Sequence, residues 1–221
     1  MRDLCSHDRS QPEQGGEAVP IKTTSQDGLI QFEIDEAILK TIEQALCGLK
    51  SQSRKVLKNA VNATAKQAKA DLAQKAQEEY AVKKTRFTKA MTSKNASLAR
   101  PEATINITGE QLELKDFKVS PASYKTGNAR PSVTKAKVLL SSSMKPLEHS
   151  GGKAFLAKFK NGHVSIVQRK GKSRFPLKKL LSNSIPKMVG SQERVYGIVE
   201  PNIYDNLMDN IVREIGKVMK K

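Results

Sequence analysis

The chain has 221 residues, 38% of them hydrophobic, and this length allows one ordinary hydrophobic core with long peripheral elements, or two very small cores. Its formal net charge of +17 at pH 7 predicts attraction to nucleic acid or to acidic protein surfaces. No apolar run is long enough for a membrane helix, and residues 1–28 lack a signal-peptide pattern, so we expect neither membrane contact nor export. The two cysteines, Cys5 and Cys47, have no neighbours at metal-ligand spacing, which favours reduced thiols.

The first part of the chain changes from a polar segment to periodic ones. Residues 1–28 contain few large apolar side chains and do not repay the entropy of ordering, so we predict a flexible polar arm. Leu29 to Ile34 alternates apolar and polar side chains, which predicts a short strand. From Asp35 to Leu49 the apolar residues recur every three or four positions, which predicts an amphipathic helix capped by Asp35.

A long helical segment follows. The stretch from about Arg54 to Met91 contains neither Gly nor Pro and is rich in strong helix formers, which predicts one long helix or two in series. Its apolar stripe is thin and alanine-rich, so one side should pack closely, and such a helix often needs a neighbouring subunit. The stripe consists of Val56, Ala60, Ala63, Leu72, Ala76 and Tyr80.

The second half is β-rich, over residues 103–200. A basic polar linker, Thr92 to Pro101, precedes predicted strands at 104–107, 112–119 and 133–140. Two alternating runs, 155–160 and 163–168, are joined by Asn161-Gly162, a dipeptide typical of a type I′ hairpin turn. Pro201 opens a last amphipathic helix. We therefore predict a single α+β domain over residues 29–221, with long N-terminal helices, an antiparallel sheet with this hairpin, and the C-terminal helix packed on the sheet.

Tests for catalytic and metal-binding patterns are negative. His7, His149 and His163 are far apart and have no partner ligand at helical spacing. Gly171-Lys172-Ser173 imitates the end of a phosphate-binding loop, but Ile166 stands where that motif needs glycine. The pairs Asp205/Asp209 and Glu78/Glu79 are typical of solvated helix faces. We predict no catalytic residue, no metal and no cofactor, and hence that the protein is not an enzyme.

Charge is the positive feature of the second half. Between Glu148 and Glu193 there is no acidic residue, while ten Lys and Arg residues occur there, which predicts a coherent basic surface for nucleic acid or an acidic protein. Phe155 and Phe159 share one strand face, which we interpret as core rather than as a base-stacking platform. Any DNA contact should therefore be made to phosphates and be insensitive to sequence.

Several segments resemble the prophage minor tail protein Z family. They are FKNGH at 159–163, QRKGKSRFP at 168–176 and SIPKM at 184–188. Two helical segments, NAVNATA at 59–65 and YAVK at 80–83, are also similar to the family pattern. The resemblance covers roughly Ile34 to Lys221, and residues 1–28 have no counterpart in it.

The resemblance implies a structural virion protein that completes the head-proximal end of a phage tail and joins it to the neck. It implies a homo-oligomeric ring, a hexamer, with tail-terminator, tube and neck proteins as neighbours, in the virion and, during assembly, in the host cytoplasm. A ring suits the thin helix, because neighbouring subunits add burial and closed symmetry stops growth. The residues proposed to contact the DNA channel or an acidic partner are Lys158, Lys160, Arg169, Lys170, Lys172 and Arg174.

A second set of residues is proposed for the joint to a neighbouring ring. Pro limits backbone freedom, and Ile and Met offer apolar anchors, although core packing explains the same residues equally well. The set is Pro176, Ile185, Pro186 and Met188. Two other functions stay open: a stand-alone, sequence-nonspecific nucleic-acid-binding protein, and a tail-tube or baseplate component of the same virion.

Overall fold

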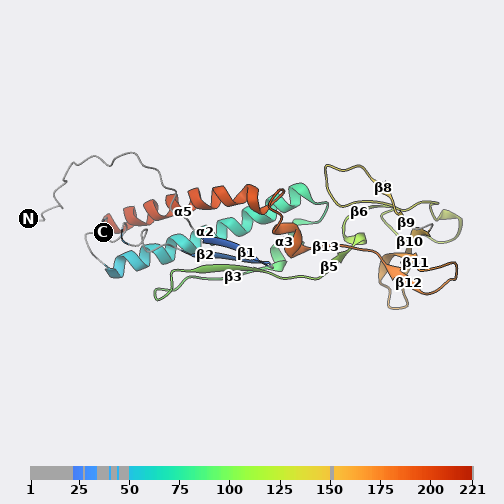
Figure 1. The fold of residues 1–221 in the computed structure, drawn as a ribbon, viewed down its shortest axis with the longest axis horizontal. Coiled ribbons are helices and arrows are strands. Elements are labelled where there is room, and N and C mark those ends of the chain that lie inside the picture. Colours follow the sequence, from blue (N-terminus) through green and yellow to red (C-terminus); the bar gives the residue numbers. More distant parts are fainter. Residues whose placement is uncertain are drawn as a thin grey trace, which may run out of the picture.

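The computed structural model describes residues 22–26, 28–33, 50–149 and 152–220, together with Lys40 and Gln44. The molecule is elongated, with helices and a four-stranded sheet at one end and short strands at the other (Figure 1). We call these ends the helical lobe, which holds β1–β4 and α2–α5, and the distal lobe, residues 114–180. The short strands β5 (Gln111–Glu113) and β13 (Leu181–Ser184) pair with each other and join the two lobes.

The helical lobe has three layers. The long helix α2 (Lys50–Glu79) lies between α5 (Tyr196–Met219) and the sheet. The sheet is antiparallel throughout, in the order β1-β2-β4-β3. Its strands are β1 (Lys22–Gln26), β2 (Leu29–Glu33), β3 (Met91–Lys94) and β4 (Ala103–Ile107). The α+β class is thus confirmed, but α5 packs on α2 rather than directly on the sheet.

The alanine-rich stripe of α2 explains its central position. Small side chains let α5 and the sheet approach the helix from two sides, because an alanine methyl takes little space between backbones. The predicted stripe is buried except for Ala63, which is partly exposed. A second buried row accompanies it, formed by Leu57, Val61, Ala65, Ala68 and Ala73. The helix is therefore covered on two sides, where the pattern predicted close packing on one.

Polar contacts fix the register of α5 against α2. The buried Asn210 amide donates to Thr64 Oγ1 at 2.9 Å, and the Asn59 amide donates to Glu214 Oε2 at 3.0 Å. A buried amide without its partner would cost about 1–3 kcal/mol. Sliding one helix along the other is therefore unfavourable.

The predicted helical stretch is split by a tertiary contact. Tyr80 forms a β-bridge with Leu139, and the Ala81 N–H donates to the Val138 carbonyl at 2.8 Å. The chain resumes as α3 (Lys84–Ala90) and then enters β3, so two helices in series is the arrangement present. The sequence carries neither Gly nor Pro at this break, because the break is made by contact with Leu139, a residue distant along the chain.

Other boundaries also differ from the predictions. Lys22–Gln26 forms β1, so this part of the predicted arm is an element of the sheet. The expected linker Thr92 to Pro101 begins within β3. Helix α5 starts at Tyr196, five residues before Pro201, so this proline lies inside the helix instead of opening it. The helix predicted from Asp35 to Leu49 lies outside the described residues, apart from Lys40 and Gln44.

The distal lobe consists of two small antiparallel sheets, with strand orders β12-β11-β10-β9 and β6-β7-β8. The first holds β9 (Glu148–His149), β10 (Gly152–Lys158), β11 (Val164–Arg169) and β12 (Leu177–Lys179). The second holds β6 (Lys118–Ser120), β7 (Lys135–Lys137) and β8 (Lys145–Pro146). The short helices η1 (Leu114–Asp116) and η2 (Gly127–Ala129) lie in the distal lobe, and α4 (Ile185–Val189) follows β13.

The hairpin between β10 and β11 has a different turn from the one predicted. The Gly162 N–H donates to the Phe159 carbonyl at 2.9 Å, which makes Lys160 and Asn161 the central residues. Gly162 follows them with φ of 80°, a left-handed value that favours glycine. This is a three-residue loop with the glycine at its end, rather than a two-residue type I′ loop centred on Asn161-Gly162.

The two lobes have cores of unequal size. The large core is built from α2, α3, α4, α5 and the sheet, and it extends into the distal lobe through Phe117. The distal core has three buried residues, Ala154, Leu156 and Ile166, with partly buried neighbours around them. The distal lobe therefore has a small apolar centre to stabilise it, and the ends of its long loops are held mainly by the hydrogen bonds of short strands.

Candidate functional site

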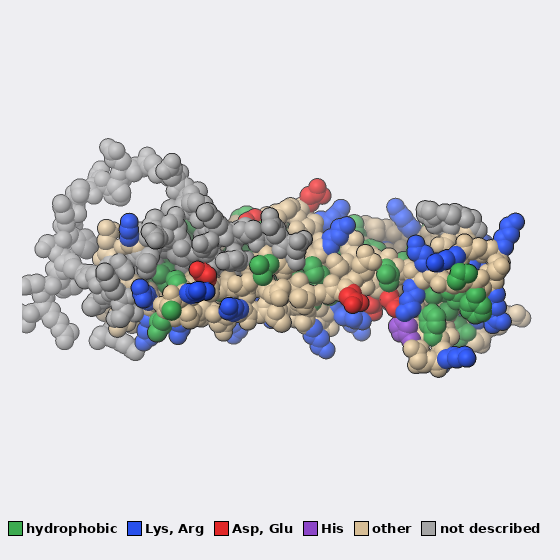
Figure 2. Space-filling model, turned by 60° about the horizontal axis from the view of Figure 1, so that its bottom comes forward, with side chains coloured by type: hydrophobic (Ala, Val, Ile, Leu, Met, Phe, Trp, Pro, Cys, Tyr) green, Lys and Arg blue, Asp and Glu red, His purple; other side chains and the backbone are tan. Residues whose placement is uncertain are grey.

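The distal lobe carries most of the net charge. Residues 114–180 contain sixteen Lys and Arg residues and two Asp and Glu residues, a net charge of +14 within a total of +17. Figure 2 shows Lys and Arg side chains spread around this end of the molecule. An anionic partner is therefore attracted to the distal lobe far more strongly than to the helical lobe.

The six basic residues predicted to contact DNA or an acidic partner are all exposed, but they form two groups. Lys158 and Lys160 lie at the hairpin turn. The other four lie at the opposite end of β11, in the loop that the Lys170 N–H closes by donating to the Pro176 carbonyl at 3.1 Å. A strand of this length separates the groups by roughly 17 Å. They are Arg169, Lys170, Lys172 and Arg174.

The distal sheet has an apolar face opposite its core. Strand pairing places Ala154, Leu156 and Ile166 on the core side, and Phe155 beside Val167 on the other side. Interpreting Phe155 and Phe159 as core was therefore wrong: both rings are partly exposed on the outer face. We call this outer surface the aromatic face; it comprises Phe155, Ala157, Phe159 and Leu177, which lie around the buried Val167.

Cationic side chains lie against the rings of the aromatic face. The Arg169 guanidinium carbon is 5.9 Å from the centre of the Phe155 ring, and Lys179 Nζ is 5.6 Å from that of Phe159. The His163 ring stacks on Phe159, with centroids 6.2 Å apart and planes 22° from parallel. These distances suit cation–π attraction, which holds the charges at the rim of the apolar surface.

One carboxylate of the chain is already bound at this rim. Glu113, at the end of β5, lies 3.0 Å from His163 Nε2 and accepts a hydrogen bond from Lys179 Nζ at 3.1 Å. Burial raises the pKa of Glu113, but the neighbouring Ser165 hydroxyl, the hydrogen bonds with Lys179 and His163 and the Lys179 charge outweigh this and lower it from 4.5 to about 2. The carboxylate is thus ionised at neutral pH, and it ties the connection between the lobes to the hairpin.

Sequence reasoning missed this cluster. Glu113 and His163 are 50 residues apart, and no local motif links them. His163 has no partner ligand at helical spacing in the sequence, but in the fold it is an exposed residue with a carboxylate partner. Because the Glu113 proton is released far below neutral pH, the cluster is suited to an ion pair and not to general acid catalysis.

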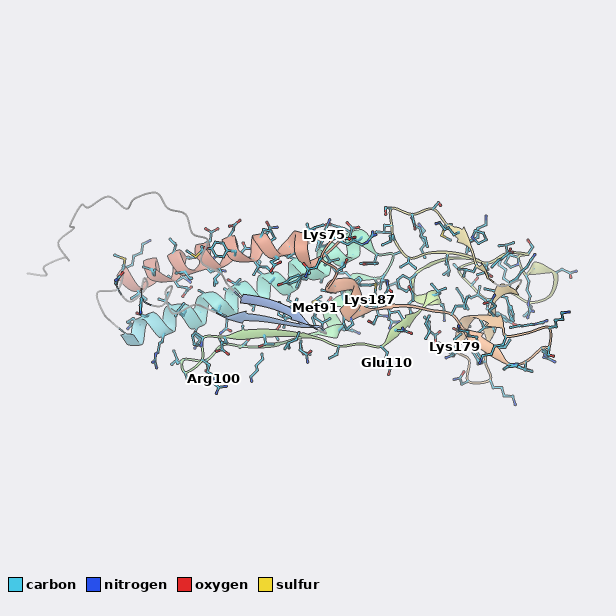
Figure 3. The ribbon with its side chains drawn as sticks, in the orientation of Figure 1. Lys75, Met91, Arg100, Glu110, Lys179 and Lys187 are labelled. Carbon is cyan, nitrogen blue, oxygen red and sulfur yellow. The ribbon has the colours of Figure 1, made fainter. Side chains whose placement is uncertain are left out.

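The residues predicted for a ring-to-ring joint do not form one surface. Ile185 and Met188 are buried in the core of the helical lobe, so core packing is the interpretation that holds for them. Pro186 is partly buried beside them, and Pro176 is exposed in the distal lobe. Figure 3 shows the separation, with Lys187 in the helical lobe and Lys179 in the distal lobe.

The described part of the chain also bears on metal binding and on membrane spanning. No three His, Cys, Asp or Glu side chains converge there as metal ligands. No described helix is both long and apolar enough to cross a membrane. Of the acidic pairs noted in the sequence, Glu79 is paired with Lys75 at 3.2 Å, and Asp205 and Asp209 are exposed on α5.

Comparison with known proteins supplies the family. The model of the family described as prophage minor tail protein Z (GPZ) matches residues 39–221, which includes the distal lobe with the whole aromatic face and the helical lobe except β1 and β2. No curated protein and no solved structure gives a significant match. Since the matched region spans most of the chain, this protein belongs to the prophage minor tail protein Z family.

Proposed function

We propose that this minor tail protein completes the head-proximal end of the tail and joins it to the neck, as a ring of six subunits around the DNA channel. Membership of a minor tail protein family supports a structural role in the virion tail rather than catalysis. The finer proposal of a ring rests on the outer surface of α5.

Helix α5 has apolar side chains on two opposite sides. One side, with Ile203, Leu207 and Ile211, is buried against α2. The other leaves Val212 66% and Met219 69% exposed. At 100° per residue, these exposed positions lie on one stripe of the helix, together with Ile198 and Met208. An apolar stripe of this kind on a surface helix favours contact with another protein surface.

Charge supports a second copy of the chain as the occupant of this stripe. Outside residues 114–180 the net charge is only +3, so helical lobes can approach each other without strong repulsion. Distal lobes at +14 each repel one another and attract phosphate. Ring contacts through α5 would leave the six basic residues of the hairpin and its following loop available to an acidic partner or to DNA, with any DNA contact insensitive to sequence.

The mass of the purified protein in solution tests the ring. We expect light scattering to give a hexamer, free or on isolated tails, over a range of concentrations and at low and high salt. The double variant Val212→Ser/Met219→Ser should remain monomeric. Leu98→Ser, which changes an exposed leucine outside α5, should assemble like the wild type.

Two other results would contradict the proposal. A strict monomer that ignores tails but retards DNA in gels would identify a stand-alone nucleic-acid-binding protein. Many more than six copies per particle would identify a tail-tube or baseplate component.

A further inference from the structure

The aromatic face is a surface that the ring contact through α5 does not use. Val167 is fully buried beneath it, and Phe155, Phe159 and Leu177 are partly exposed around Val167. Figure 2 shows hydrophobic side chains gathered on the distal lobe, with Lys and Arg side chains around them. An apolar centre with a charged rim is the common composition of a protein docking surface.

The chemistry of the rim is visible in the contact that Glu113 makes. His163 and Lys179 together bind this carboxylate from a neighbouring strand at 3.0 and 3.1 Å. At the other end of the face, Arg169 lies over Phe155 and forms no ion pair with a described residue. A carboxylate supplied by a partner could pair with Arg169, as the Glu113 carboxylate pairs with Lys179.

Three other occupants fit this surface less well. A duplex presents phosphates and sugars, which can pair with Arg169 but cannot cover Phe155 and Phe159. Unpaired bases would have to stack on rings that Arg169, Lys179 and His163 already contact. A second copy of the distal lobe would be repelled, because each copy carries a net charge of +14. A protein segment with both apolar and acidic side chains satisfies the centre and the rim together.

We propose that the aromatic face binds an acidic segment of a different protein of the virion, whose apolar side chains cover Phe155 and Phe159 and whose carboxylates pair with Arg169. The proposal rests on the tail-to-neck position put forward above, but not on the formation of a ring. The distal lobe would then bind a neighbouring protein, and the exposed lysines of its loops would remain available for any contact with DNA.

Photocrosslinking from the aromatic face tests the identity of the occupant. Phe155 is replaced by benzoylphenylalanine in the full chain, which is mixed with tails and filled heads from a phage that lacks this protein, and then irradiated. We expect a covalent link to a different virion protein, mapped by mass spectrometry to a segment rich in Asp and Glu. The same group at Leu98, exposed in the helical lobe, should not link to that segment.

Each other outcome overturns the proposal. A link to DNA or to another copy of the chain, or no link on particles that retain the chain, excludes an acidic protein at this face. If the chain binds neither heads nor tails, the tail-to-neck position fails as well. The mass in solution reports on the ring separately, so failure of the ring and failure of the docking face are distinguishable.

Substitution at the rim gives a second test that leaves the core untouched. Arg169→Gln should lower attachment to the particles at least tenfold, because it removes the rim cation that packs on Phe155 and pairs with the carboxylate of the partner. Lys170→Gln, the neighbouring exposed cation without a ring contact, should change attachment less than twofold. Equal losses for the two variants would indicate nonspecific attraction and would contradict docking at the aromatic face.

Discussion

The helical lobe and the distal lobe differ in the size of their cores and in their net charge. The helical lobe holds most of a large continuous core and, with the rest of the chain outside residues 114–180, has a net charge of only +3. The distal lobe has a buried cluster of three residues of its own and a net charge of +14. Burial stabilises the first, whereas the second keeps exposed charges and partly exposed rings that a minimal core does not require. We infer from this difference that the helical lobe supplies most of the stability and that the distal lobe supplies most of the surface that recognises partners.

The largest effect is expected in the centre of the helical lobe. Leu72 is fully buried on α2, between α5 and the sheet. Leu72→Ala should lower the free energy of unfolding by roughly 3 kcal/mol, because it removes buried methyl groups and leaves a cavity. Urea denaturation followed by circular dichroism measures this change, and Leu98→Ala is the exposed control. A decrease below about 1 kcal/mol would mean that this core is not the main source of stability.

A matching substitution in the distal core would show whether the lobes unfold separately. Ile166 is one of the three residues of the buried distal cluster. Ile166→Ala should lower the free energy of unfolding by roughly 2–3 kcal/mol, and this loss should destabilise mainly the distal lobe. Hydrogen exchange should then show weaker protection in β10, β11 and β12, with α2 and α5 still protected. Simultaneous loss of protection in both lobes would break the comparison, since it would identify one cooperative unit.

The Glu113 cluster predicts a smaller, pH-dependent effect on the connection between the lobes. The pKa of Glu113 is depressed from 4.5 to about 2, so its contribution to stability is fully present above pH 4.5 and is lost as the pH falls towards 2. Glu113→Gln should therefore lower the free energy of unfolding at pH 7 by roughly 1–2 kcal/mol, because water screens the exposed His163 and Lys179. Thermal melts from pH 7 to pH 2 should show the wild type and the variant converging. A constant difference across that range would contradict an ionised, paired Glu113.

The smallest effect on stability is expected for the exposed loop of the distal lobe. The double variant Lys170→Gln/Lys172→Gln should change the free energy of unfolding by less than about 0.5 kcal/mol. Its affinity for duplex DNA should fall, and the slope of log affinity against log salt should decrease by about 2, one unit for each phosphate that the variant no longer neutralises. Gel retardation at several salt concentrations measures both. An unchanged slope would place any DNA contact elsewhere on the protein.

Much of the fold followed from local patterns. Alternation located β2 and the strands β10 and β11, and composition located the helical stretch that contains α2 and α3. Element ends were less predictable, because α2 stops where Tyr80 meets Leu139 and α5 continues through Pro201. The hairpin of β1 and β2 had an available signal, the dipeptide Asp27-Gly28, in a segment predicted to be an arm.

The sequence predicted the charge of the candidate site but not the contacts between its residues. The basic character of the distal lobe is a property of composition, and it survives any arrangement of the strands. The partners of Glu113 and the burial of Ile185 and Met188 depend on segments that are distant in the chain, which no local pattern reports.

By itself, the sequence determined the α+β class, the concentration of charge in the second half and the resemblance to a minor tail protein family. Only the tertiary structure decided which side of β10 is the core. Period-2 alternation separates Leu156 from Phe155 but does not say which of the two faces the other elements cover. Here they cover the side with the smaller residues, because η1, β6 and the loop that follows it supply the neighbours of Ala154, Leu156 and Ile166, and the phenylalanines are left facing outward.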